Sequence, residues 1–186
     1  MDPQIEGYLL QLLSLTQDLP GVAGRLSPSQ FNWRPSPERW SIGQCVEHLN
    51  ITTERYVPVL RTAIATARAT GALAPGPFAL GFFERWFMNV LEPPVRRFRA
   101  TAPRAFVATQ PLVPDETLAR WDRFHEDFAD CIRSAEGLDL RRIKVRSQFG
   151  PVSFSLGGTF SILLAHERRH VWQAREVRND RGFPVG

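Results

Sequence analysis

The chain has 186 residues, of which 43% are hydrophobic and 11% aromatic, so it is long enough to bury the core of one domain and short for two. Its formal net charge is +4, and of its 23 basic residues only Lys144 is a lysine. This small positive excess identifies no binding partner by itself. The composition excludes intrinsic disorder, and we expect a single domain over residues 1–186.

No stretch of the sequence has the character of a membrane span. The longest uncharged run, residues 147–165, contains glycine, proline, serine and glutamine and falls short of the ~20 apolar residues that a membrane helix needs. The apolar segment at residues 8–15 follows acidic residues instead of a basic leader, which argues against a secretory signal. Two cysteines, Cys45 and Cys131, are too few for a disulfide framework. We therefore expect a reduced, cytoplasmic protein with no membrane partner.

The first third of the chain has the hydrophobic pattern of helices, because apolar residues recur at steps of three and four. The first predicted helix covers residues 3–25, with a kink expected at Pro20. Ser27, Pro28 and Gln30 then have the pattern of a capped short helical turn. The residues of the first helix that should face inward are Leu9, Leu12, Leu13, Leu19 and Val22.

The second long helix should begin at Ser41 and continue to about residue 69. Ser41 is a favourable N-cap residue, and Gln44 completes a capping box with it. The apolar stripe of this helix consists of Ile42, Val46, Leu49, Thr53, Tyr56, Leu60 and Ile64.

The remainder of the chain should contain one short and two long helices. Residues 78–91 have the pattern of a short aromatic helix, and the prolines that follow indicate a long extended crossover. The third long helix should begin near Pro114 and be capped near Gly137. Residues 141–152 are predicted to be irregular and extended, and the last helix should cover residues 155–179. These elements predict an all-α four-helix bundle with a long crossover and a short extra helix.

Two histidines, His166 and His170, lie four residues apart on the last predicted helix. This spacing puts both imidazoles on one side of the helix, where they can bind one metal ion. With Glu167 the string reads H-E-x-x-H, which is the pattern of zinc peptidases. Those enzymes need a downstream ligand, but no histidine follows, and Gln173 stands where the turn glycine would be. Glu176 lies about 240° round the helix from His170, so we reject the peptidase class.

The other two histidines have less specific surroundings. His48 lies at the edge of the apolar stripe of the second long helix, one turn after Cys45. His125 lies within the apolar face of the third long helix. Each of these side chains is compatible with an ordinary buried role, and either Cys45 or His125 could be a fourth metal ligand.

Two pairs of sequence stretches resemble a known family. Residues 31–35 read FNWRP and residues 40–49 read WSIGQCVEHL. Near the other end, residues 149–153 read FGPVS and residues 165–174 read AHERRHVWQA. Together these motifs resemble the DinB/YfiT-like superfamily, and the resemblance covers nearly the whole chain. It implies a four-helix bundle in up-down-down-up order, with a long crossover, that forms a homodimer.

The resemblance also implies a metal site and a class of reaction. In the superfamily, histidines matching His48, His166 and His170 hold a divalent metal, commonly zinc or nickel. Characterised relatives act on low-molecular-weight thiols such as bacillithiol or mycothiol, which implies a thiol-S-transferase with a small-molecule substrate and a role in stress or detoxification. Three histidines leave coordination positions free, so a hydrolase that uses metal-bound water is the alternative.

Two polar residues near the pair on the last helix are candidates for catalytic roles. Glu167 could orient an imidazole or act as a general base, although a salt bridge to an arginine is the more ordinary role, because buried acids are usually paired. The amide of Gln173 could reach the site, or it could form an interhelical hydrogen bond.

Nucleic-acid binding is a weaker hypothesis from another class, as is a non-catalytic bundle that serves in protein interaction. The sequence has two basic clusters but no recognition motif, and 19 acidic residues nearly balance the 23 basic ones. The clusters are Arg96, Arg97, Arg99 and Arg104, and Arg141, Arg142, Lys144 and Arg146.

Overall fold

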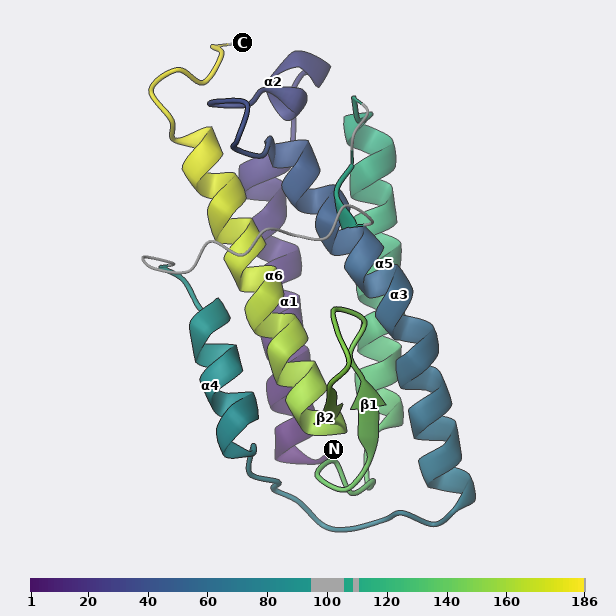
Figure 1. Cartoon of the computed structure of the whole chain (residues 1–186). Helices are drawn as coiled ribbons and strands as arrows, with labels where there is room; N and C mark the ends of the chain where they lie inside the picture. Colours follow the sequence, from purple (N-terminus) through teal and green to yellow (C-terminus); the bar gives the residue numbers. More distant parts are fainter. Residues whose placement is uncertain (95–105, 109–110, 186) are drawn as a thin grey trace.

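Four long helices pack side by side in the computed structural model, which describes residues 1–94, 106–108 and 111–185 (Figure 1). The helices α1 and α6 run in one direction, and α3 and α5 run in the other, so the order is up-down-down-up. The helix α1 packs against α5 and α6, and α3 packs against the same two helices, so the four form a closed ring, and the bundle architecture is confirmed. The long helices are α1 (Pro3–Ala23), α3 (Ile42–Ala69), α5 (Pro114–Ser134) and α6 (Leu156–Arg178).

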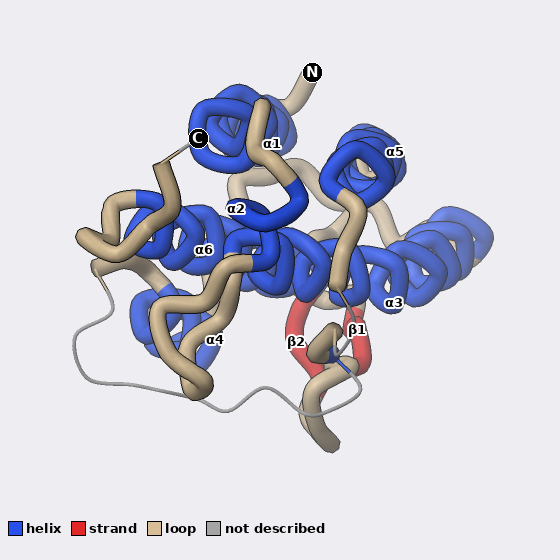
Figure 2. Tube along the Cα trace, turned by 90° about the horizontal axis from the view of Figure 1, so that it is seen from above, coloured by secondary structure: helices blue, strands red, loops and turns tan. Residues whose placement is uncertain are grey.

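The remaining elements lie at the edges of the bundle. Figure 2 shows the strands β1 and β2 on the face of α3 and α6 that is turned away from α1 and α5, with α4 beside α6. None of the helices in the described ranges is long and apolar enough to cross a membrane. The smaller elements are α2 (Pro28–Asn32), α4 (Phe82–Leu91), β1 (Lys144–Arg146) and β2 (Ser153–Ser155).

The capping residues read from the sequence begin α2 and α3 as predicted. The Ser41 hydroxyl accepts a hydrogen bond from the Gln44 backbone at 3.0 Å, and the Gln44 side chain accepts one from the Ser41 backbone at 3.1 Å. Ser27 and Gln30 form the same capping box at α2. Every residue of the predicted apolar stripe of α3 is buried. These caps fix where α3 begins, and therefore the height of His48 in the bundle.

Three details of the helices differ from the prediction. Leu13 is 51% exposed, because the buried stripe of α1 follows Leu12, Leu15, Leu19 and Val22 and leaves Leu13 outside it. The short aromatic helix begins at Phe82 instead of residue 78, since Gly81 is its N-cap residue. The third long helix ends at Ser134, and Gly137, with a φ of +77°, lies in the turn that follows.

Residues 144–155 form a small antiparallel hairpin where the sequence indicated only an irregular extended stretch. Val145 is paired with Phe154, and both side chains are buried. Strands of three residues are too short to show a clear alternation of apolar and polar residues in the sequence. Their pairing depends on packing against the bundle, which the sequence pattern does not show. The hairpin positions its connecting loop next to α3 and α6.

Glu84 on α4 connects this helix to the start of α6. Its carboxylate accepts hydrogen bonds from the backbone N–H groups of Ser155 at 2.6 Å and of Gly81 at 2.9 Å. Burial raises the pKa of Glu84, but these hydrogen bonds outweigh it, and the net pKa is lowered. A Cβ atom on Gly158 would lie 2.5 Å from the Glu84 carboxyl carbon, so glycine is needed for the approach.

We predict that Gly158→Ala lowers the free energy of unfolding by about 1–3 kcal/mol, because the added methyl group displaces the Glu84 carboxylate. Chemical denaturation followed by circular dichroism measures this change. Gly7→Ala on α1 is the matched control: no atom lies within 4 Å of its new Cβ, so stability should be equal or higher. Equal losses of stability in both variants would contradict the assigned role of Gly158.

Candidate metal centre

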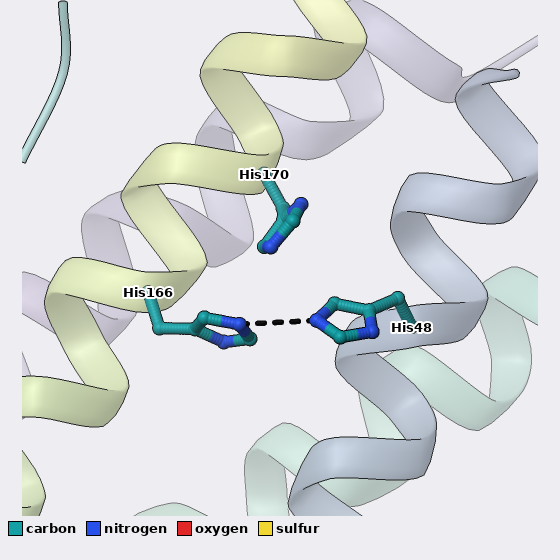
Figure 3. A group of neighbouring side chains, drawn as sticks. All are labelled: His48, His166 and His170. Carbon is teal, nitrogen blue, oxygen red and sulfur yellow. Dashed lines mark hydrogen bonds between the residues drawn. The ribbon is translucent and has the colours of Figure 1, made fainter. Parts of the chain in front are cut away.

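The structure brings His48, His166 and His170 together between α3 and α6. One ring nitrogen from each residue lies within 4.8 Å of the other two. Figure 3 shows the two histidines of α6 on adjacent turns, both directed toward His48 on α3. The Nε2 atoms of His48 and His166 are 3.0 Å apart, and the three side chains are at most 9% exposed. The structure therefore places His48, at the edge of the apolar stripe of α3, next to the pair His166 and His170, which their spacing of four residues puts on one side of α6.

A backbone hydrogen bond fixes the tautomer of His48. Its Nδ1 lies 2.8 Å from the carbonyl oxygen of Phe106, and because a carbonyl can only accept, Nδ1 carries the proton. The Nε2 of His48 then presents a lone pair to His166. This is the neutral form of imidazole that binds metals, with the second ring nitrogen held by a hydrogen bond to the backbone.

Burial favours the neutral form of all three imidazoles. It lowers the pKa of His48, although the hydrogen bond to Phe106 opposes the change. It lowers the pKa of His166 and of His170 well below the usual value, and the neighbouring rings and the positive charge of Arg169 lower both further. A hydrogen bond that the His170 ring donates to the Gln173 side chain partly opposes the lowering of the His170 pKa.

The three nitrogens suit a divalent cation by their chemistry, and two of them also have the spacing of bound ligands. Two nitrogens bound to one zinc ion at about 2.1 Å lie about 3.0 to 3.4 Å apart for angles between those of octahedral and tetrahedral sites. The His48 and His166 Nε2 atoms have this separation without any rearrangement. The Nδ1 atoms of His166 and His170 are buried with no hydrogen-bond partner among the described residues, so neither ring is held by a strong polar contact at that atom.

Aromatic rings surround the histidines. Trp40 stacks on His170 with ring centroids 5.4 Å apart, and Phe106 and Phe149 lie 6.2 Å from His48 and 5.6 Å from His166 respectively. Phe149 belongs to the loop of the hairpin and is 38% exposed. The walls of the site are therefore apolar, and one of them faces solvent. These aromatic residues were not singled out as site walls from the sequence, because only the fold brings 106 and 149 next to the histidines.

Tyr56 on α3 holds the loop that carries Phe149. Its hydroxyl accepts a hydrogen bond from the Gln148 backbone at 3.1 Å and lies 3.3 Å from the Ser147 hydroxyl. Its ring also lies 5.9 Å from that of Phe149. The apolar stripe of α3 predicted that Tyr56 is buried, but its contact with the loop depends on the hairpin.

Glu167 is directed to α5, where its partner is His125. Its carboxylate lies 3.1 Å from the Nε2 of His125, whose Nδ1 lies 3.0 Å from the Trp121 carbonyl oxygen. Both side chains are almost fully buried. Glu167 and His125 are therefore hydrogen-bond partners. This geometry favours a role for Glu167 in orienting α6 against α5 over proton transfer at the three histidines.

Neither of the two candidates for a fourth ligand joins the cluster. Within the described ranges, the group of metal-binding side chains contains His48, His166 and His170 and excludes Cys45 and His125. The residues outside those ranges include no histidine, cysteine, aspartate or glutamate. The chain therefore offers three such ligands at this site, which is the number typical of catalytic metal centres.

Comparisons with known proteins show the family and the fold of this chain. Residues 11–174 match the model of the DinB superfamily, and the chain therefore belongs to that family. The solved structure of YfiT from Bacillus subtilis has a TM-score of 0.61 and 13% sequence identity, with 95% of this chain and 87% of that one covered. YfiT is described as a probable metal-dependent hydrolase with an unusual four-helix bundle topology. None of the curated proteins matches this chain.

We predict that both cysteines are unreactive in the native protein at neutral pH. Burial raises the pKa of Cys45, and it raises the pKa of Cys131 to about 11, so neither residue forms a thiolate. Reaction with a disulfide reagent should therefore occur only after unfolding. Cys131→Ser isolates Cys45, and rapid labelling of this variant while it is folded would contradict the buried position of Cys45.

Proposed function

We propose that this chain is a divalent-metal-dependent enzyme whose metal ligands are His48, His166 and His170. The observation that supports the proposal best is the convergence of three buried, neutral imidazoles from two helices on one point. Imidazole suits zinc and nickel equally, and both are candidates. The similarity to YfiT, whose description names a metal-dependent enzyme, supports the same class.

A bound divalent cation would act as a Lewis acid that lowers the pKa of a thiol or of water. The chain supplies the rest of the site. Phe106 holds the ring of His48 through its carbonyl group, and Gln173 contacts His170. Trp40, Phe106 and Phe149 exclude water from the rings and favour an apolar substrate.

We propose transfer of a low-molecular-weight thiol as the reaction. The thiol sulfur forms a bond to an electrophilic carbon, the bond from that carbon to its leaving group breaks, and the leaving group departs with the electron pair. The thiol proton is released to solvent. Because the carboxylate of Glu167 is hydrogen-bonded to His125, it is not free to act as a general base at the three histidines. A thiol is more acidic than water and therefore depends less on such a base. A detoxification or stress role follows from this chemistry.

Hydrolysis is the second candidate, and the description of YfiT favours it. The two reactions share the metal ligands and differ in the nucleophile. They also differ in the substrate, which would be an ester or amide in place of an alkylating or arylating compound.

We predict that the protein purified without a histidine tag holds one divalent metal per chain. His166→Ala and His170→Ala should each reduce metal content by at least about tenfold, because each removes one of only three ligands. Elemental analysis measures the loss, and circular dichroism checks the fold. His125→Gln is the matched control and should retain metal, since His125 contacts Glu167. Retention of metal in either alanine variant would refute the ligand assignment.

We predict that the metal-loaded protein turns over an aryl halide only when a thiol is present. Halide release should depend on thiol concentration, with bacillithiol and mycothiol among the thiols assayed. His48→Ala should abolish turnover, whereas Glu167→Gln should leave it within a few-fold, because Glu167 contacts α5. Turnover of esters or amides without thiol would instead establish the hydrolase. No turnover of either kind at full metal loading would contradict both reactions.

A further inference from the structure

A groove with a volume of about 880 Å³ lies along the C-terminal half of α3, away from the three histidines. One side is formed by α3 from Pro58 to Thr70, and the other by residues 139–146, which include strand β1. At about 1.5 Å per residue, this part of α3 is about 18 Å long. The groove has the volume of a small-molecule site, which is usually about 300–1,000 Å³.

The α3 side of the groove is largely apolar. Val59, Ala63 and Ala67 line it at helical spacing, and none of the three is exposed. Hydroxyl groups accompany them, but Thr62 donates to the Pro58 carbonyl and Thr70 to the Thr66 carbonyl. Because these two donors are already used within the helix, Thr66 is the remaining hydroxyl of this side, and the side offers a ligand mainly apolar contact.

The opposite side carries positive charge. Arg142, Lys144 and Arg146 are exposed and line the groove. Lys144 and Arg146 lie on the same face of β1, with the buried Val145 between them. Among the described residues, no ion pair involves Arg142 or Arg146, and the positive charge of Lys144 contributes to the lowered pKa of Glu84. Two guanidinium groups are therefore available for an anion.

One acidic residue also lines the groove. Asp139 accepts hydrogen bonds from the backbone N–H groups of Arg141 and Arg142, at 3.1 Å and 3.0 Å. Its carboxylate thus caps the turn that leads into β1 and does not form an ion pair with a groove arginine. The net charge of the lining is positive.

We propose that this groove binds a small, elongated amphipathic anion: a molecule with an apolar body and a carboxylate, sulfonate or phosphate group. The apolar body would lie along α3, and the anionic group would be bound by Arg142 and Arg146. The proposal is independent of the metal centre, since it uses none of the three histidines or the aromatic rings around them.

The shape and charge of the groove favour a free small molecule over a large partner. A membrane surface is bound by several protruding apolar side chains, whereas Val59, Ala63 and Ala67 are not exposed and Leu73 is the one exposed large apolar side chain of the described lining. Of the second basic cluster of the sequence, Arg142, Lys144 and Arg146 line the groove and Arg141 does not. The first cluster, Arg96, Arg97, Arg99 and Arg104, lies outside the described residues.

The test uses decanoate as the probe, measured by isothermal titration and by amide chemical shifts of the full chain at low salt. Decanoate below its micelle concentration should bind and shift resonances of α3 residues 59–70 and of β1. The double variant Arg142→Gln/Arg146→Gln should bind at least about tenfold more weakly. Ala63→Trp, which fills the apolar side, should abolish binding. The neutral analogue decanol should bind much more weakly than decanoate.

Arg141→Gln is the matched control, because it removes one neighbouring charge that does not line the groove, and binding should stay within about twofold. Equal weakening by Arg141→Gln and by the double variant would overturn the proposal, as would equal binding of decanol and decanoate. Binding of anionic phospholipid vesicles or random-sequence DNA in the absence of decanoate binding would also overturn it, in favour of a macromolecular partner. Metal content is measured in every variant and should not change.

Discussion

A buried imidazole has two ring nitrogens that each need a polar partner, and three such rings meet where α6 packs against α3. Only one of their Nδ1 atoms, that of His48, has a hydrogen bond to the protein among the described residues. A buried polar atom without a partner costs about 1–3 kcal/mol. At the centre of the cluster, the Nε2 atoms of His48 and His166 face each other 3.0 Å apart, and a shared cation would be a partner for both of these nitrogens at once. The lowered pKa values of the rings keep them in the form that a cation needs.

The rest of the bundle holds these rings at a fixed height. The capping box of Ser41 and Gln44 fixes the start of α3, and Ser155 and Glu84 fix the start of α6. Because both helices are anchored at their N-terminal ends, His48 lies two turns below one anchor and His166 three turns above the other. The pair of Glu167 and His125 adds a polar contact between α6 and α5 on the side of α6 that faces the interior.

Local sequence patterns predicted most of the fold, and tertiary contacts decided the rest. Helix periodicity and capping residues gave α2, α3 and α6 nearly to the residue, because these signals are carried within a few positions of each helix end. The spacing of His166 and His170 predicted a shared face. The partner of Glu167, the ring of Phe149 over His166 and the pairing of Val145 with Phe154 could not be predicted, since each joins segments far apart in the chain. The wheel position of Leu13 was misleading because it lies beside the buried stripe of α1.

The most direct test of the metal centre is a crystal structure of the protein soaked with zinc or nickel, with anomalous diffraction recorded at the absorption edge of that metal. The account predicts a single strong anomalous peak about 2.0–2.2 Å from one nitrogen of each of His48, His166 and His170. An anomalous peak next to His125 or Cys45 instead, or no peak near the three histidines at saturating metal, would contradict this assignment of the metal ligands.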